Sequence, residues 1–289
     1  FCFIDKYIYN LIIQQKKLDE IIQICLSNTF IDKDTICNIH NKSINTLSNK
    51  ENGIDNRDKC NIIVSSHIKN NHDKLQGDIC EVGVYQGFSL IATALFLKEI
   101  GSEKKVWGFD SFSGFPSYHK YDSLSYFKVL YQQGDISEEH YDQYLLNIQH
   151  KEYVTGANLN PSNISTSEDF SNTSMTLLEK KIEYFKLDNI EIVDGDYKDT
   201  MRLDAPIDTK FMTVLMDCDL YKSHQLSLPF VWDRMPIGGY MFLDEYYSLK
   251  FPGARIATNE FFSDKLDKPE MYPRKPMDFE RWFVKKNSQ

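Results

Sequence analysis

Several features are missing from this chain of 289 residues, and each absence excludes a class of protein. The longest apolar run, around Leu90 to Leu97, falls far short of the roughly 20 residues that span a bilayer. Phe1 to Ile13 is interrupted by charged residues and lacks a small-residue cleavage site, so it does not read as a signal peptide. We therefore expect a cytoplasmic protein with no membrane partner. The chain does not begin with Met, which suggests one module of a longer protein.

Clustered positive charge is also lacking. The formal net charge is -9, and acidic residues are spread along the whole chain. Affinity for phosphate backbones rests on clustered Lys and Arg, so we expect no nucleic-acid partner. The six cysteines form no Cys-x-x-Cys pair and no zinc-ligand spacing, which favours reduced, buried thiols.

Residues 1–76 are predicted to form a helical N-terminal appendage. From Ile4 to Leu26, apolar residues recur at helical spacing, which indicates one or two amphipathic helices. Asp32 to Asp73 is rich in Asn, Lys, Asp and Ser and predicts short helices and loops. This segment carries no chemistry of its own, so we expect a packing or homo-oligomer contact.

At Gly77 the pattern changes to short apolar runs that alternate with helical patterns, which predicts an α/β domain over 77–289. The predicted strands are Ile79–Val84, Lys105–Phe109, Ile190–Val193, Phe211–Met216, Gly239–Leu243 and Arg281–Val284. The predicted helices are Phe88–Glu99, Ser174–Phe185, Ser223–Arg234 and Ala254–Lys265. An insertion at about 116–172 shows no strand signal and many tyrosines, and we interpret it as a lid with a helix near Ser137–Ile148.

The first candidate site is the segment from Glu81 to Ser89, which leaves a strand and enters a helix. Gly83 and Gly87 allow a sharp turn and a close approach to a nucleotide-like ligand. Their spacing is neither the dinucleotide Gly-x-Gly-x-x-Gly pattern nor a P-loop. Glu81 favours an amino-acid-like moiety whose ammonium needs an anion. An ordinary strand-to-helix turn is the alternative.

Acidic residues also end the next two strands. Asp110 stands where doubly wound sheets place the acid that binds a ribose diol, although a capping Asp would look the same. Asp196 and Tyr197 could bind an adenine amino group and cover its ring, but the same residues are also typical of a turn followed by a helix cap.

The most specific pattern is a pair of acidic motifs, Asp217-Cys218-Asp219 after one strand and Asp244-Glu245 after the next. Adjacent parallel strands bring such residues together at the carboxyl edge of the sheet. Asp219, Asp244 and Glu245 offer oxygen ligands that suit Mg²⁺ with open positions for water or substrate hydroxyls. Solvated loop carboxylates are the alternative.

At this point the sequence resembles the macrocin O-methyltransferase family, the TylF-like class of metal-dependent sugar methyltransferases. The matching segments, in family order, are Gly77–Val84, Phe109–Phe112, Gly114–Pro116, Asp199–Thr200, Asp217–Tyr221, Asp244–Tyr246 and Pro252–Arg255. Two departures occur. Glu245 stands where the family usually has Asp, and Cys218 replaces the Gly between the two aspartates.

The resemblance implies a seven-stranded, Rossmann-like class I methyltransferase fold that binds S-adenosylmethionine. The implied cofactor contacts are Glu81, Gly83, Tyr85, Gly87, Ser89, Asp110, Ser111, Asp196, Tyr197 and Asp217. The resemblance also implies that Asp219, Asp244 and Glu245 hold Mg²⁺, which binds neighbouring hydroxyls of a sugar.

We therefore hypothesise an O-methyltransferase in which Asp217 receives the proton of a sugar hydroxyl. His224, one turn into the following helix, is a rival base. A catechol-like acceptor is a second reading, and a non-catalytic S-adenosylmethionine-binding module is a third.

Overall fold

The computed structural model describes residues 56–274 and 278–288, and its centre is a seven-stranded sheet. The strands are β1 (Asp78–Val82), β2 (Val106–Asp110), β3 (Ile190–Asp194), β4 (Phe211–Met216), β5 (Tyr240–Leu243), β6 (Glu270–Met271) and β7 (Trp282–Lys285). Their order is β3-β2-β1-β4-β5-β7-β6, with the first five parallel and β7 and β6 joined antiparallel. This confirms the predicted Rossmann-like α/β fold.

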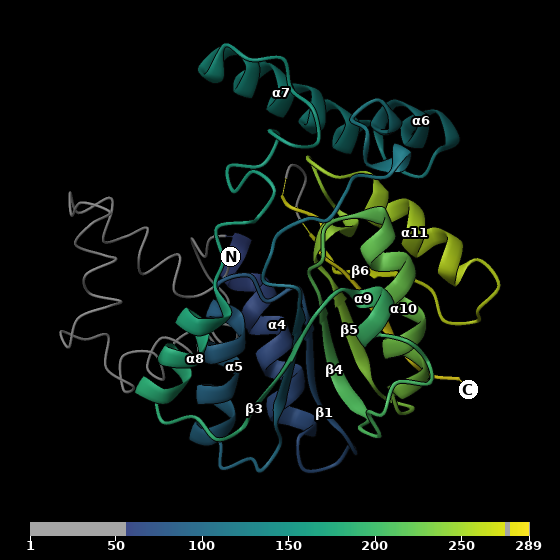
Figure 1. Cartoon of the computed structure of the whole chain (residues 1–289). Helices are drawn as coiled ribbons and strands as arrows, with labels where there is room; N and C mark the ends of the chain where they lie inside the picture. The colour runs from purple at the N-terminus through teal and green to yellow at the C-terminus, as the bar shows by residue number, and fades with distance from the viewer. Residues whose placement is uncertain (1–55, 275–277, 289) are drawn as a thin grey trace.

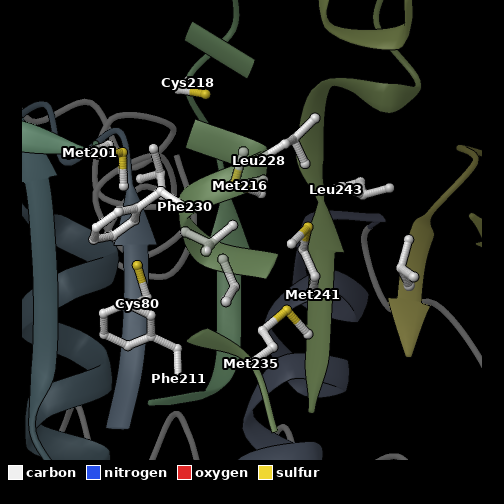
Figure 2. Close-up of a cluster of buried hydrophobic side chains, with 14 of the residues drawn as sticks. Cys80, Met201, Phe211, Met216, Cys218, Leu228, Phe230, Met235, Met241 and Leu243 are labelled. Atoms are coloured by element: carbon white, nitrogen blue, oxygen red, sulfur yellow. The ribbon is translucent and has the colours of Figure 1, made fainter. Parts of the chain in front are cut away.

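Helices cover both faces of the sheet (Figure 1). One face packs against α4 (Asn56–Asn71), α5 (Phe88–Glu99) and α8 (Met175–Tyr184), and the other against α9 (Tyr197–Thr200), α10 (Tyr221–Arg234) and α11 (Gly253–Phe262). Each face carries one apolar cluster, the first with α4, α5 and α8 and the second with α9, α10 and α11. Neighbouring residues of β1 point to opposite faces, since Ile79 belongs to the first cluster and Cys80 to the second. Figure 2 shows the second cluster, which includes Phe230 of α10 and Phe211 and Met216 of β4. Burial on both faces explains the near-continuous apolar runs of the central strands.

The insertion forms a lid above the carboxyl ends of the parallel strands (Figure 1). It contains a short 3-10 helix, η1 (Lys120–Asp122), and two helices, α6 (Tyr126–Gln133) and α7 (Glu138–Thr155). The rings of Phe127 and Tyr144 stack 4.0 Å apart between these helices. The apolar cluster between these helices also packs against Leu249 and Ile256, so it attaches the lid to the domain beneath.

Most predicted elements are present. All six predicted strands occur, and β6 adds a seventh of only two exposed residues, too short to leave a periodic signal. The predicted helix at Ser137–Ile148 starts as expected, because the Ser137 hydroxyl accepts the His140 N–H, and continues to Thr155. Helix α6 was not predicted. It has eight residues, and the glycine that follows it, Gly134, adopts a left-handed conformation and ends the helix.

The amino-terminal predictions are covered only in part. Ile4 to Leu26 lies outside the described residues, while 56–71 forms one helix, α4, whose Ile68 belongs to the core. The domain boundary at 76/77 stays a prediction. Cys80 and Cys218 are buried free thiols. Among the described residues, no helix has the length and apolar character needed to cross a bilayer.

Helix α4 is attached to the sheet by a half-buried histidine. The Nδ1 atom of His67 lies 2.9 Å from the Thr213 hydroxyl of β4, and the ring stacks on Tyr240 of β5 at 4.8 Å. Burial, with a smaller contribution from the charge of Lys285, lowers the pKa of His67 to about 4. The folded protein therefore holds this ring neutral.

The pKa of His67 predicts an acid-dependent loss of stability. The unfolded chain takes up a proton below pH 6.5 and the folded chain only near pH 4, so stability falls as the pH drops through this window. The contribution of His67 should fall by roughly 2 kcal/mol from pH 7 to pH 5. We expect the unfolding free energies of the wild type and His67→Gln, measured in urea, to converge by this amount. An equal difference at both pH values would contradict the assignment.

Candidate functional site

A large cavity opens at the carboxyl edge of the sheet, under the lid. Its volume of ≈ 1430 Å³ exceeds the roughly 300–1,000 Å³ of common small-ligand sites, which leaves space for two molecules. Of the ten predicted cofactor contacts, eight line it: Gly83, Tyr85, Ser89, Asp110, Ser111, Asp196, Tyr197 and Asp217. Glu81 and Gly87 do not line the cavity, and both lie directly behind its wall.

The two glycines after β1 allow close packing. Gly83 has φ 93°, and a Cβ there would lie 1.9 Å from the backbone oxygen of Asp217. The Asp217 N–H donates to Val82 O at 2.9 Å, so the ends of β1 and β4 are in direct contact. A Cβ at Gly87, which precedes α5, would lie 2.2 Å from the Leu178 side chain of α8. The predicted turn therefore also joins neighbouring elements.

Glu81 is a buried carboxyl behind this turn. Its Oε1 accepts the Ser89 hydroxyl at 2.5 Å, and Ser89 itself faces the cavity. Burial raises the pKa of Glu81 to about 8, the Ser89 hydrogen bond lowers it, and the charge of Asp217 raises it. At neutral pH most Glu81 therefore carries a proton, and a cation placed at Ser89 would favour its release.

The predicted ribose acid, Asp110, has backbone partners. Its Oδ2 accepts the N–H groups of Val84 and Tyr85 at 2.8 Å each, and its Oδ1 accepts that of Phe112 at 2.7 Å. A carboxylate accepts about four hydrogen bonds, so one position is left for a ligand. Asp110 thus shapes the turn and still faces the cavity.

At the predicted adenine site, Asp196 caps a helix and also lines the cavity together with Tyr197. Asp196 caps α9 by accepting the Lys198 N–H at 2.9 Å. A helix cap was the alternative to adenine binding that the sequence left open for this residue. The Tyr197 hydroxyl donates to Phe109 O of β2 at 3.3 Å, which fixes the ring at the rim. Both residues line the cavity.

Three carboxylates meet at the ends of β4 and β5. Asp217, Asp244 and Glu245 each offer an oxygen atom within 4.8 Å of the others. Asp219, the predicted third ligand, is not in this group, although it lines the same cavity with 5% of its surface exposed. It has φ 57°, a left-handed conformation that is rare outside glycine. The geometry therefore favours an exchange of the predicted roles of Asp217 and Asp219.

One ammonium faces this acidic group. The Lys250 Nζ lies 3.3 Å from Glu245 Oε1. Burial alone would lower the pKa of Lys250, but the surrounding carboxylates raise it above its usual range, Glu245 most strongly. Burial, together with the charge of the neighbouring acids, raises the pKa of Asp217, Asp219 and Asp244.

The charge balance and donor set fit a divalent cation. Four acidic side chains share one ammonium, and Glu245 Oε2 is buried with no hydrogen-bond partner. Carboxylate oxygens select hard ions such as Mg²⁺. Asp217, Asp244 and Glu245 are thus the residues that could hold such an ion.

The sequence indicated no role for Lys250, and it suggested His224 as a rival base. Lys250 was missed, because its position shortly after Glu245 belongs to no periodic pattern or motif. His224, the rival base, is buried away from the cavity, where its Nδ1 lies 3.1 Å from Leu220 O. Burial lowers the pKa of His224 to about 4, so it is a neutral packing residue.

Solved structures of methyltransferases share this fold. The O-methyltransferase NovP matches with a TM-score of 0.54 and 17% identity over 89% of this chain and 100% of NovP. The calicheamicin methyltransferase CalS11 matches with a TM-score of 0.56 and 16% identity, over 85% of this chain and 90% of that one. The chain thus has the fold of a Rossmann-like O-methyltransferase.

Sequence comparison identifies the family. The chain belongs to the macrocin-O-methyltransferase (TylF) family, whose sequence signature matches residues 61–156 and 152–271. A demethyldecarbamoylnovobiocin O-methyltransferase from Streptomyces niveus is 26% identical over 190 residues, which are 65% of this chain and 59% of that enzyme. The predicted family is therefore confirmed, while the match spans under two thirds of this relative.

The contact between Gly83 and Asp217 predicts that a single methyl group added at Gly83 greatly lowers the stability of the fold. Gly83→Ala should destabilise the fold by about 3–5 kcal/mol, since overpacking adds to the left-handed backbone cost. Gly134→Ala is a matched control, because Gly134 has φ 78° but nothing within 4 Å of its Cβ position. Urea unfolding should separate the two variants by at least about 2 kcal/mol. Equal losses would show that the contact is unimportant.

Proposed function

We propose that this chain is an S-adenosylmethionine-dependent O-methyltransferase that methylates a sugar hydroxyl with the help of a bound divalent metal. The observation that carries the proposal is the carboxylate cluster of Asp217, Asp244 and Glu245 in one cavity with the glycine turn after β1. Membership of the macrocin-O-methyltransferase family supports the reaction class.

The cofactor would lie along the carboxyl ends of β1, β2 and β3. The Ser89 hydroxyl, with the Glu81 carboxyl directly behind it, would bind the ammonium of the cofactor. Asp110, with its remaining acceptor position, and Ser111 would bind the ribose, and Asp196 and Tyr197 would bind the adenine. Gly83 and Tyr85 would bring backbone against the amino-acid portion, and Gly87 would place the start of α5 beneath it.

The carboxylates beyond β4 and β5 would prepare the acceptor. When bound, S-adenosylmethionine supplies an electrophilic methyl group and the divalent cation lowers the pKa of a nearby hydroxyl. Asp217, Asp244 and Glu245 would hold the cation, and the carboxylate of Asp219 would receive the hydroxyl proton. Burial, and after it the charge of Glu245, raises the pKa of Asp219, which makes its carboxylate a stronger base.

The acceptor would occupy the lid side of the cavity. Asn147 and Lys151 of α7 line this part, and polar groups that surround a hydrophilic ligand are what a sugar requires. The lid would exclude water while the reacting atoms are brought into line.

The proposal is tested by titrating the chain with S-adenosylhomocysteine, with and without Mg²⁺, and then screening free and nucleotide-linked deoxysugars for methyl transfer. We expect a Kd on the order of micromolar and turnover that requires the metal. Asp219→Asn should abolish turnover while cofactor binding is kept. No binding in either condition would falsify the proposal, and binding without turnover or metal dependence would favour a non-catalytic module.

The acidic cluster predicts opposite effects of two substitutions on metal affinity. Asp244→Asn removes a ligand and should weaken Mn²⁺ binding at least about tenfold. Lys250→Met removes the competing positive charge and should strengthen binding by about tenfold or more. Electron paramagnetic resonance of free Mn²⁺ measures both.

Lys222→Met is the control for Lys250→Met. Lys222 also lines the cavity, but its ammonium donates to Gln225 Oε1 and pairs with no carboxylate in the described part of the chain. The net charge changes equally in both variants. Equal effects of the two lysine substitutions would show that the ammonium of Lys250 does not compete with the metal.

The pKa of Glu81 predicts how cofactor affinity depends on pH. Because the free carboxyl has a pKa of about 8, an ammonium that binds beside it displaces a proton below that pH. Affinity for S-adenosylhomocysteine should therefore rise from pH 6 to 8, by up to about tenfold per pH unit. Ser89→Ala, which removes the bond that lowers this pKa, should shift the rise to higher pH. A flat profile in the wild type would rule out this role for Glu81.

A further inference from the structure

Helix α10, which follows the Asp217–Leu220 loop, begins without a cap of its own. Its N-cap residue, Leu220, has no side chain that can accept a backbone N–H. The first N–H groups of a helix lack partners inside the helix and need an external acceptor. Here the Tyr221 N–H donates to Asp122 Oδ1 at 2.8 Å, and Asp122 belongs to the lid, 99 positions earlier in the chain. The lid therefore supplies the acceptor that caps α10.

The same carboxylate also closes the first turn of the lid. Asp122 Oδ2 accepts the His119 N–H at 2.7 Å, within the capping box of η1. The His119 ring stacks on the Tyr221 ring at 4.5 Å and 18°. One buried side chain thus fixes the entrance of the lid and the start of α10 against each other.

A third segment packs on this carboxylate. A Cβ at Gly253, the first residue of α11, would lie 2.1 Å from Asp122 Oδ1 and 2.7 Å from Tyr221 Cβ. Helix α11 follows the segment that carries Glu245 and Lys250. Asp122 therefore lies where the lid, the loop after β4 and the segment after β5 converge.

Asp122 is not part of the cavity wall. It has no exposed surface and does not line the cavity. Among the residues described, no lysine or arginine forms an ion pair with it. Its partners are backbone N–H groups, at a helix end whose dipole favours a negative charge.

We propose that Asp122 is a positioning residue that makes the geometry of the acidic cluster depend on a docked lid entrance. The loop that it holds carries Asp217, which is in the cluster, and Asp219, whose left-handed backbone needs support from its surroundings. The metal and proton roles of these residues rest on the proposed function. The mechanical link between the lid and the loop does not.

The test compares Asp122→Asn with Asp267→Asn. The first variant keeps the size of the side chain but loses the charge and one of its two acceptor oxygens. Asp267 is a similarly buried carboxylate that accepts the backbone N–H groups of Asn287 and Ser288, away from the cavity. Both substitutions should lower the Tm, so stability alone does not distinguish a positioning role.

Two measurements distinguish it. Hydrogen exchange should accelerate in Asp122→Asn at 217–224 and 119–126, with 83–90 unchanged, and Asp267→Asn should show neither effect. Mn²⁺ affinity should fall by about tenfold or more in Asp122→Asn, while affinity for S-adenosylhomocysteine stays within about twofold. If Asp122→Asn does not fold, Gly253→Ala, which crowds the same carboxylate, takes its place with the same expected results.

Unchanged exchange at 217–224 would overturn the positioning role. Faster exchange there with Mn²⁺ affinity equal to that of the wild type would also overturn it, because the loop would move without affecting the cluster. If the wild type binds neither Mn²⁺ nor S-adenosylhomocysteine, the proposed function fails. The exchange at 217–224 and 119–126 then decides the structural link alone.

Discussion

Four acidic side chains lie near the ammonium of Lys250, and this crowding is the constraint on which the rest of the site depends. Two of them, Asp219 and Glu245, are buried, and two, Asp217 and Asp244, are half-buried. Removing carboxylates from water costs several kcal/mol each unless a positive charge or hydrogen bonds compensate. Lys250 offsets part of this cost, and the unpartnered Glu245 Oε2 shows that compensation is incomplete. The parallel order of β4 and β5 makes this crowding unavoidable, because their carboxyl ends meet at one edge. The proposed cation would relieve this crowding.

Backbone strain is concentrated at the same edge. Tyr85, Phe170 and Asp219 line the cavity with φ values of 51°, 60° and 57°, which cost about 1–3 kcal/mol each for residues other than glycine. Tyr85 is held from the lid side, where the Thr173 hydroxyl donates to its carbonyl. Such conformations persist only where the surroundings fix them. The contacts around the cavity wall therefore hold these conformations in place.

The fold was largely predictable from sequence because central strands buried on both faces leave plain apolar runs. The convergence of acidic motifs at the strand ends was predictable for the same reason. The grouping of Asp217 rather than Asp219 with Asp244 and Glu245 was not, since it depends on how the chain turns after β4, and the left-handed backbone of Asp219 leaves no sequence signal. Lys250 and Asp122 reach the site from irregular segments, where neither periodicity nor spacing indicates a partner far away in the chain. Helix α6 was hidden by its short length.

The two ends of the lid lie side by side. The Phe115 N–H donates to Asp169 O at 2.8 Å, and a Cβ at Gly114 would lie 2.7 Å from the same oxygen. The chain between them leaves the sheet and returns to the point of departure, and its apolar cluster around Phe127 and Tyr144 packs against Leu249 and Ile256. Because loop-closure entropy grows only slowly with length, the distal part of this segment can change length at little cost, while its entrance, where Asp122 caps α10, stays tied to the domain beneath. The lid thus combines an entrance fixed to the domain beneath with a distal part whose length and sequence can vary.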